Sequence, residues 1–544
     1  MEISWKVYVP IVGVICLLVA GAAFFILQSS LQPSNPSGID PTLEMLMTLH
    51  VHQDEINTRV AAALATEPVT QNANPTVDSG TPNAPVETPL PTATVNTPLP
   101  GETPLPTPTI QAPDGHIVYV IQTGDTMQGL RRRFETEERF IQSAEPLSKR
   151  YFLQPGVVTF IPFDPALHEY GPDTRLMPDM AVVNGPLDAD FDVAAYVQIT
   201  GGFLSHYAEE TRDEVKSGVQ IVEEISNIHS ISPKLLLAIL EYQSGWVLND
   251  EFSMAADKYP IGYGMSTAPG LYEELYITAR ELGKGYYWWR DGSWPAVFLD
   301  EETPLILHPS LNAGTVALSN LMAGLYDRQN WTTVLYGKDS LTNLYIQMFG
   351  DPFTAAKNLP DLIPGNLSQP EMELPFQTGE DYHLTSGPHR AWGYGSPWAA
   401  VDFAPADGVS GCTTSTFWVT SMTEGLVVRS DDGQVLVDID MDGDEGTGWV
   451  IFYLHIAKNG RVPVGTTLNV DDRIGHASCE GGVASGSHVH IARKYNGEWI
   501  TAGGPVPLVM SGWETVATMA EYGGYLVRGS QTVQSYPFSI NESR

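Results

Sequence analysis

The chain has 544 residues, more than a single typical hydrophobic core accommodates, so the sequence predicts several domains. It carries 28 basic and 64 acidic residues, which gives a formal net charge of −36. Nucleic acid and anionic lipid surfaces are normally bound through positive patches, so this balance argues against either as the main partner.

An uncharged apolar segment, residues 7–27, is long enough as a helix to cross a bilayer. Lys6 precedes it and no Lys or Arg follows closely, so the positive-inside rule places the N-terminus in the cytoplasm and the rest of the chain outside. We therefore assign residues 1–30 as a single-pass signal anchor in the cell membrane. A cleaved signal peptide, which would make the protein secreted, is the alternative.

The next two segments separate this anchor from the folded part of the chain. Residues 31–65 contain a short amphipathic stretch, most simply a solvated helix. Residues 66–114 are rich in Pro and Thr, repeat TPLP three times, and contain no Lys or Arg. Such a composition buries no core and favours extended polyproline conformations, so this segment is predicted to be a spacer.

Residues 115–165 are predicted to form a small unit with a strand at each end. HIVYV, from His116, alternates as a strand does, Thr126 is placed to cap a helix, and PGVVTFIPF supplies a closing strand. The segment resembles the LysM module, a βααβ unit, and the resemblance implies peptidoglycan as a partner. It lacks the asparagine that usually precedes the closing strand. The matching residues are Tyr119, Val120, Gly124, Asp125, Thr126, Met127, Phe134, Pro155, Gly156, Ile161 and Pro162.

Residues 186–360 are predicted to form an α-helical domain. Ser232 and Pro233 begin one helix in the preferred order of cap and proline. Two further helices are predicted from apolar residues at helical spacing. One contains Val215, Val219, Val222, Ile225 and Ile228, and the other contains Leu311, Val316, Leu318, Leu321, Met322 and Leu325.

The stretch SPKLLLAILEYQSGW weakly resembles the active-site helix of lysozyme-like lytic transglycosylases. That family has a catalytic glutamate before the serine, whereas this chain has Gln243 before Ser244. An amide cannot donate the proton that glycosidic cleavage requires, and Glu241 would face away on a helix. The domain is therefore predicted to be a noncatalytic, structural or glycan-binding relative.

Residues 375–544 have the alternation of antiparallel strands. His488 and His490 share one face of a strand, and His455 is expected on the strand face of Trp449, Ile451 and Tyr453. Upstream lie His389 and Asp402, in a loop-rich stretch of Gly, Pro and aromatic residues. His389, Asp402 and His490 are a suitable ligand set for Zn²⁺ that leaves a fourth position for water.

Residues 377–512 resemble the zinc endopeptidases of the lysostaphin type, specifically the beta-lytic metallopeptidase branch. Most of the wider family has its first histidine four residues before the aspartate, where this chain has Trp398. The beta-lytic branch takes that ligand from farther upstream in a GPH…DF arrangement, which His389 and Asp402 match. The resemblance implies that His455 and His488 are the catalytic pair, and it leaves open which of them is the general base.

Two other features near this site have two interpretations each. Trp392, Tyr394 and Trp398 could line a substrate groove that prefers small residues, or they could be packing residues. Cys412 and Cys479 are predicted to form a disulfide rather than to bind metal, because they lack a close C-x-x-C spacing.

An aspartate-rich stretch matches the first half of a calcium-binding loop. Asp438, Asp440, Asp442 and Gly443 have the required spacing, but Trp449 stands where the bidentate glutamate belongs. A turn between two strands explains the composition adequately and is the preferred interpretation, and a Ca²⁺ site is the less favoured alternative.

The predicted fold class is multidomain α+β, with a transmembrane helix, a LysM-like module, a helical middle domain and a mainly antiparallel-β C-terminal domain. The resemblance implies a membrane-anchored zinc metalloendopeptidase that hydrolyses stem or cross-bridge peptides of bacterial peptidoglycan. The alternative is a noncatalytic peptidoglycan-binding scaffold or regulator of cell-wall remodelling.

Overall fold

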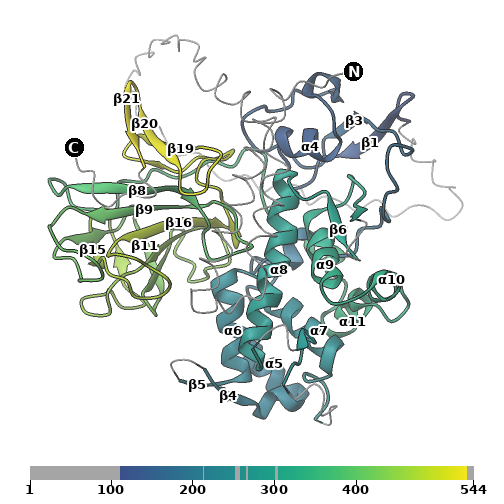
Figure 1. Cartoon of the computed structure of the whole chain (residues 1–544), viewed down its shortest axis with the longest axis horizontal. Helices are drawn as coiled ribbons and strands as arrows, with labels where there is room; N and C mark the ends of the chain where they lie inside the picture. Colours follow the sequence, from purple (N-terminus) through teal and green to yellow (C-terminus); the bar gives the residue numbers. More distant parts are fainter. Residues whose placement is uncertain (1–110, 212–213, 251–257, 265–267, 300–303, 536–544) are drawn as a thin grey trace, which may run out of the picture.

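The computed structural model describes residues 111–211, 214–250, 258–264, 268–299 and 304–535, which form a small N-terminal unit, a helical unit and a C-terminal β unit (Figure 1). The predicted anchor at 1–30, the amphipathic stretch at 31–65 and most of the 66–114 spacer lie outside the described residues. Within the described ranges, no helix has the length and apolarity that crossing a membrane requires.

The small N-terminal unit is a three-stranded antiparallel sheet with one helix. Its strands β1 (His116–Val120), β3 (Val158–Pro162) and β2 (Gln142–Ser143) lie in that order, and α4 (Met127–Arg133) packs on them. The Thr126 side chain accepts a hydrogen bond from the Gly129 N–H and caps α4 as predicted.

The βααβ order predicted for this unit is wrong at its second helix. In its place is a single 3₁₀ turn, Glu138–Phe140, followed by the short strand β2. Pro146 lies three residues after the end of β2, and a proline lacks the N–H that a helix needs and disfavours helical geometry at the residue before it.

The helical unit is built around its longest helix, α8, which packs against α6 and α9. The helices of this unit are α5 (Val193–Thr200), α6 (Gly218–His229), α7 (Pro233–Ser244), α8 (Leu271–Asp291), α9 (Ala313–Ala323), α10 (Arg328–Tyr336), α11 (Leu341–Phe349) and α12 (Pro352–Ala356). It also contains the 3₁₀ turns Asp179–Ala181 and Phe203–His206, and the hairpins β4 (Ala208–Glu210) with β5 (Val215–Ser217) and β6 (Ala296–Phe298) with β7 (Pro304–Ile306).

The predicted helices exist, with corrected ends. Ser232 caps α7 and Pro233 is its first residue, as predicted. Val215, expected inside the first helix, instead lies in β5 and is 67% exposed, because Ser217 forms a capping box with Gln220 that begins α6 at Gly218. Helix α9 is shorter than its apolar pattern and excludes both Leu311 and Leu325.

The C-terminal unit is mainly antiparallel β, as predicted. Its main sheet has the order β14-β11-β12-β13-β16-β9-β8, with β17 paired to β16. The strands are β8 (Tyr382–His389), β9 (Ala400–Pro405), β11 (Gly425–Asp431), β12 (Gln434–Asp438), β13 (Trp449–Leu454), β14 (Thr467–Leu468), β16 (Val489–Tyr495) and β17 (Glu498–Trp499); β10 (Trp418–Thr420) pairs with β15 (Arg473–His476), and β18 (Val509–Met510), β19 (Trp513–Ala517), β20 (Gly524–Arg528) and β21 (Gln531–Gln534) form a second sheet.

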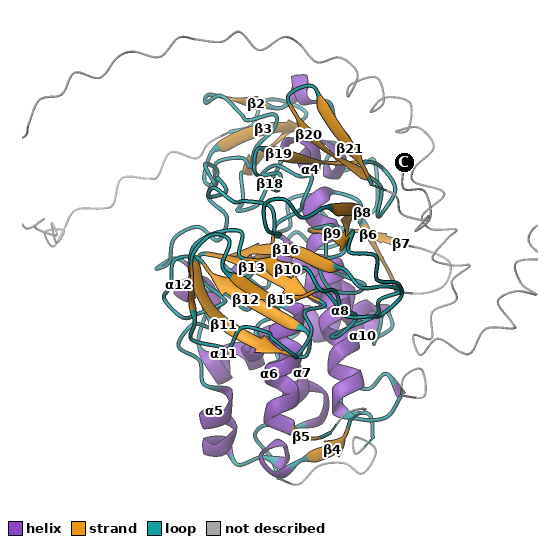
Figure 2. Cartoon of the chain, turned by 90° about the vertical axis from the view of Figure 1, so that its left-hand side faces the viewer, coloured by secondary structure: helices purple, strands orange, loops and turns teal. Residues whose placement is uncertain are grey.

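The main sheet is buried on both faces. Along β13, Ile451 and Tyr453 belong to the core of the C-terminal unit, whereas Phe452 and Leu454 belong to the core that contains the helices. In Figure 2 the main sheet lies in front of the helical unit. Apolar burial of this kind contributes about 1.5–3 kcal/mol for each large side chain. The helical unit and the sheet are therefore continuous, although the sequence predicted them as separate domains.

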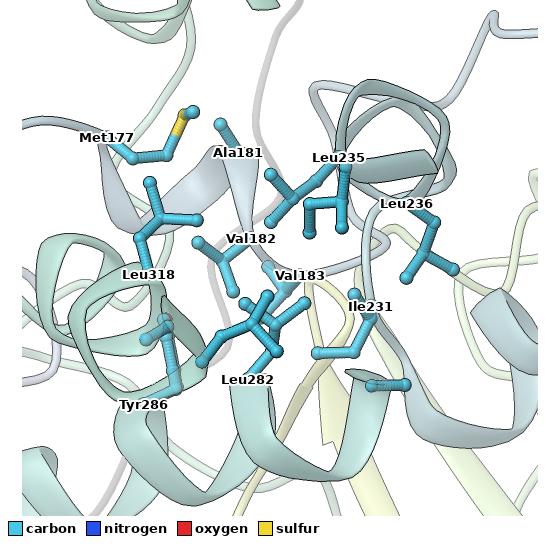
Figure 3. Packing of buried hydrophobic residues seen from close by; sticks show 14 of the residues in the cluster. Met177, Ala181, Val182, Val183, Ile231, Leu235, Leu236, Leu282, Tyr286 and Leu318 are labelled. Atoms are coloured by element: carbon cyan, nitrogen blue, oxygen red, sulfur yellow. The ribbon is translucent and has the colours of Figure 1, made fainter. Parts of the chain in front are cut away.

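The interior of the helical unit forms one side of that continuous core. Figure 3 shows Leu282 of α8, Leu235 of α7 and Leu318 of α9 around Val182 and Val183. All five are buried.

Arg290 of α8 joins all three units. Its guanidinium pairs with Asp179 at 3.2 Å and with Glu498 of β17 at 3.0 Å, and it donates to the carbonyl of Thr123 in the small unit. The Tyr286 hydroxyl also donates to Glu498, at 2.8 Å. This buried network fixes the N-terminal unit and the β unit to the same end of α8.

Candidate metal centre and active site

Three adjacent strands bring the predicted ligands together. His389 ends β8, Asp402 lies in β9, and His490 lies in β16 directly opposite Asp402 in the strand register. Asp402 Oδ1 lies 3.3 Å from His389 Nε2 and 3.2 Å from His490 Nδ1, and the two nitrogens are 3.1 Å apart. The three side chains are 5–7% exposed.

Backbone carbonyls orient both imidazoles. The Gly387 carbonyl lies 2.9 Å from His389 Nδ1, and the Ala391 carbonyl lies 3.0 Å from His490 Nε2. A ring N–H that donates to a carbonyl leaves the other ring nitrogen as a lone-pair donor. His389 Nε2 and His490 Nδ1 therefore face Asp402 as available ligands.

The three atoms fit a metal ion. Ligands about 2.0–2.1 Å from a tetrahedral ion are separated by about 3.4 Å, close to the spacings found here. Asp402 Oδ1 is buried and has no hydrogen-bond partner among the described residues. Although burial opposes its ionisation, His389 and His488 hold the pKa of Asp402 well below its usual range, so its carboxylate is charged at neutral pH.

His455 and His488 lie beside this ligand set. Their ring centroids are 4.4 Å apart, and His488 Nε2 lies 3.7 Å from Asp402 Oδ1. The carbonyls of Glu480 and Gly486 lie 2.8 Å from Nδ1 of His455 and of His488 respectively, which leaves each Nε2 as the free ring nitrogen.

The two imidazoles differ in their surroundings. Burial, followed by the neighbouring His488 and His490, lowers the pKa of His455 to about 3, so His455 is neutral at neutral pH. His455 is buried, whereas His488 is only partly buried, so His488 is the more exposed of the two.

The predicted strand face of His455 is wrong. Strand β13 ends at Leu454, and His455 has a φ of +67°, so the alternation that carries Ile451 and Tyr453 into the β-unit core stops before it. The turn directs the imidazole toward His488 instead. A non-glycine residue in this region is uncommon and often marks a functional site.

Of the aromatic residues upstream of Asp402, Tyr394 contacts the helical unit and Trp392 contacts β13 of the main sheet. The Tyr394 ring lies 5.5 Å from the Arg280 guanidinium of α8, and the Trp392 ring lies 6.2 Å from that of Phe452. A Cβ at Gly395 would overlap the Arg280 carbonyl, so the loop approaches α8 closely. These contacts favour the packing interpretation for Trp392 and Tyr394; Trp398 is half-buried, and its carbonyl accepts from the Ala502 N–H.

Sequence reasoning missed Tyr522, whose ring stacks on His389 with centroids 4.9 Å apart and an interplanar angle of 24°. Its carbonyl accepts from the Gly387 N–H at 2.7 Å, and its own N–H donates to the Pro388 carbonyl. A Cβ at Gly387 would lie 2.5 Å from the backbone nitrogen of Gly524. The pair of glycines after Tyr522 was the available signal for this close approach.

Cys412 and Cys479 form a disulfide, with a Cα–Cα distance of 5.4 Å. The backbone next to each cysteine reaches the site, because the Gly411 carbonyl accepts from the Ser487 N–H and the Ser478 N–H donates to the His455 carbonyl. The crosslink therefore ties together two loops that border the catalytic histidines.

Neither Gln243 nor the nearby Glu241 in α7 is available as a general acid for glycoside cleavage. The Gln243 side-chain oxygen accepts from the Tyr326 hydroxyl at 2.8 Å. The Glu241 carboxylate accepts from the N–H groups of Val247 and Leu248 just after the helix ends. Both side chains have structural partners, and the likeness of this helix to lytic transglycosylases stays a prediction.

Comparison with known proteins relates most of the described chain to proteases. Residues 175–361 match the family model "LasA, N-terminal domain", which brackets the helical domain predicted at 186–360. Protease LasA of Pseudomonas aeruginosa strain PAO1 is 27% identical over 338 residues, covering 58% of this chain and 72% of the relative. Protease LasA of strain UCBPP-PA14 is 25% identical with the same coverage.

Two solved metallopeptidase structures are also similar to parts of the chain. The deep-sea M23 metalloprotease pseudoalterin is 23% identical, with a TM-score of 0.27, and covers 31% of this chain and 96% of its own. The catalytic domain of the antimicrobial peptidase lysostaphin from Staphylococcus simulans is 20% identical, with a TM-score of 0.17, and covers 23% and 89%. Together with the donor set of His389, Asp402 and His490, the relationship to Protease LasA confirms the sequence prediction that the chain is a metallopeptidase.

Proposed function

We propose that the chain is a zinc endopeptidase of the beta-lytic branch of lysostaphin-type enzymes and that it hydrolyses peptide bonds in bacterial peptidoglycan. The observation that carries this proposal is the convergence of His389 Nε2, Asp402 Oδ1 and His490 Nδ1 within 3.1–3.3 Å of one another. Two nitrogens and one carboxylate oxygen, with a position left for water, are a typical catalytic zinc set.

These three side chains would hold the zinc ion. When bound, zinc polarises a carbonyl and lowers the pKa of water toward about 7. The carbonyls of Gly387 and Ala391 keep the imidazoles in the tautomers that present His389 Nε2 and His490 Nδ1.

His455 and His488 move the protons of the reaction. Because its pKa is lowered to about 3, His455 is a neutral imidazole at neutral pH, and its Nε2 is left with a free lone pair. His488 is the more exposed of the two and so lies nearer to an incoming substrate. One of the pair takes the proton of the attacking water and returns it to the leaving nitrogen; the other hydrogen-bonds the developing oxyanion.

Localisation and substrate form the finer part of the proposal. Residues 7–27 anchor the chain in the cell membrane with its N-terminus in the cytoplasm. The 66–114 spacer, at about 3.1 Å per residue when extended, would span on the order of 150 Å. The small N-terminal unit, which resembles LysM in its first strand, its capped helix and its closing strand, would then hold peptidoglycan near the β unit.

The test is cleavage of purified peptidoglycan, and separately of a pentaglycine peptide, by the zinc-loaded full chain. We expect new amino termini that disappear with a chelator and return when Zn²⁺ is added back. Asp402→Asn should be inactive, whereas Asp471→Asn, the same change at an exposed aspartate of the β unit, should keep full activity. Cleavage that persists in chelator would contradict a metal mechanism.

The full chain is the appropriate material because one face of the main sheet is buried against the helical unit. Removing residues before 375 would expose Phe452 and Leu454. The second candidate function is a noncatalytic peptidoglycan-binding scaffold. The observation that favours it is the burial of the three ligands, and the same assay tests it. Peptidoglycan that is bound but not cut by a chain containing one zinc ion would favour that scaffold.

A further inference from the structure

The hairpin loop between β12 and β13 brings three carboxylates together at the end of β13 opposite to His455. One ligand oxygen each from Asp438, Asp440 and Asp442 lies within 4.8 Å of the others. Asp440 and Asp442 are exposed, and Asp438 is fully buried at the end of β12. We propose that this cluster binds a calcium ion, separate from the metal centre of the peptidase.

The local backbone has the form that a calcium loop requires. Calcium loops place carboxylates at positions 1, 3 and 5 and a glycine at position 6, where the chain turns sharply. Gly443 occupies that sixth position with a φ of +90°. Its N–H donates to Asp438 Oδ2 at 2.9 Å, which fixes the first carboxylate and leaves its other oxygen for a ligand.

A second observation, besides the shape of the loop, is that the other carboxylate oxygen of Asp438 has no hydrogen-bond partner among the described residues. Asp438 Oδ1 is buried and makes no hydrogen bond within the described residues. Burial, together with repulsion from Asp440 and Asp442, raises the pKa of Asp438 to about 6. A buried carboxylate that lacks a counter-charge and leaves one oxygen without a donor is unfavourable, and a bound cation would supply both the charge and the missing contact.

Basic side chains of the protein do not supply the missing charge. Arg429 and Lys494 lie near the loop, but both pair with Glu445, at 3.0 and 3.8 Å. Among the described residues, no Lys or Arg forms an ion pair with any of the three aspartates. The compensating charge must therefore come from solution.

The chemistry of the ligands selects calcium. Three carboxylates with no nitrogen or sulfur donor suit a hard cation, and a flexible loop of this kind tolerates the six to eight oxygens that calcium prefers. Because Trp449 replaces the bidentate glutamate at the twelfth position, the remaining oxygens would come from the backbone and water, and we expect a weak dissociation constant of about 10⁻⁴–10⁻³ M.

The loop also touches the helical unit, so the ion would stabilise that contact. A Cβ at Gly446 would lie 3.1 Å from the Asn184 carbonyl, and the Ser230 hydroxyl donates to the Gly497 carbonyl at 2.6 Å. The Gly448 N–H donates to the side-chain oxygen of Asn496 at 3.0 Å, which joins the loop to the turn after β16. Calcium binding should therefore raise the melting temperature of the whole folded part.

The experiment uses the full chain with its peptidase centre saturated by zinc. Tb³⁺ is titrated while its luminescence is excited through tryptophan, because Trp449 lies directly after the loop, and Ca²⁺ is then added as competitor. We expect Ca²⁺ to displace Tb³⁺ from the wild-type chain. Asp440→Asn, at an exposed position, should weaken Ca²⁺ binding at least tenfold, and Asp471→Asn should bind as the wild type does.

A second readout separates loss of the site from loss of the fold. We expect Ca²⁺ to raise the melting temperature of the wild type and of Asp471→Asn, but not that of Asp440→Asn. Equal Ca²⁺ affinity in wild type and Asp440→Asn would overturn the proposal, as would a wild-type chain from which millimolar Ca²⁺ displaces no Tb³⁺. Asp442→Asn provides a further test, with the same tenfold loss expected.

Discussion

The sequence predicts one position in the β unit and one in the helical unit that resemble the active site of a wall hydrolase, and the two positions differ in their surroundings. In the β unit, His389, Asp402 and His490 lie within 3.3 Å of one another and include a buried oxygen without a partner among the described residues. In the helical unit, Gln243 stands where an acid would be required, and its oxygen is occupied by the Tyr326 hydroxyl. The metal centre offers the lone pairs that bind a cation, whereas the amide of Gln243 has no acidic proton to give to a glycosidic oxygen.

Removing the charge of Asp402 is expected to have the largest effect on that contrast. An asparagine side chain at this position would keep the shape of the aspartate but would lack the negative charge that binds a dication. For Asp402→Asn we expect metal content below about one-tenth of wild type and peptide cleavage reduced about 10³-fold or more, since metal polarisation contributes several kcal/mol. Metal analysis and a peptide-cleavage assay measure the two quantities. Full metal content in this variant would contradict the assigned ligand set.

Replacing one metal-binding histidine and one proton-transfer histidine separates the two roles, because each replacement should affect a different measured quantity. His455→Ala should retain the metal and lose turnover by about 10²–10⁴-fold, because His455 acts as a proton-transfer group next to the ligands. His490→Ala should lose the metal itself. Metal content measured beside the cleavage rate distinguishes the two variants, and equal metal loss in both would contradict the division.

The ligand set could be predicted because its residue types suit zinc and because His389 and Asp402 match the GPH…DF arrangement of the beta-lytic branch. The antiparallel register that places Asp402 opposite His490 joins distant segments and could not be read from the sequence. Tyr522 could not be predicted in the same way, because its position depends on a close approach between Gly387 and Gly524 from distant segments. His455 failed for a different reason, since a single residue with positive φ ends the alternation on which the prediction relied.

The same limits apply to the other elements. The cap of α7 depends on neighbouring residues and was predicted correctly. Val215 was assigned to a helix because it fits the apolar spacing, but the cap at Ser217 begins α6 after it. The continuity of the sheet with the helical unit could not be read from patterning. A strand such as β13, buried on both faces, is apolar throughout, and its sequence does not say which partner covers which face.

Arg290 connects the two regions, and its removal tests whether they are held as one body. Arg290→Met would leave Asp179 and Glu498 as buried carboxylates without a counter-charge, so we expect the free energy of unfolding to fall by about 3–5 kcal/mol. Arg139→Met, which removes an exposed pair with Glu137, should cost at most about 1 kcal/mol. Thermal unfolding measures both. An unchanged melting temperature in Arg290→Met would show that the junction contributes little.

The smallest expected effect concerns His229 of α6 and the pH dependence of stability. His229 lies in the hydrophobic core, unlike the histidines of the metal centre. It is buried with no hydrogen-bond partner for Nε2 among the described residues, and its ring lies 4.7 Å from that of Tyr276. Burial, and secondarily the charge of Arg280, lowers its pKa from 6.5 to about 3. Because the folded-state pKa lies below the unfolded value, the stabilisation is complete above about pH 6.5 and is lost as pH falls toward about 3, by about 1.4 kcal/mol per pH unit.

His229→Gln removes the titrating group, so its melting temperature should fall less steeply between about pH 6.5 and 4 than that of the wild type. His383→Gln, an exposed histidine in β8, should keep the wild-type slope. The histidines of the metal centre titrate in all three proteins, and the difference between slopes therefore isolates His229. If His229→Gln kept the wild-type slope, acid unfolding would begin at the metal centre, where protonation of the ligands releases the ion.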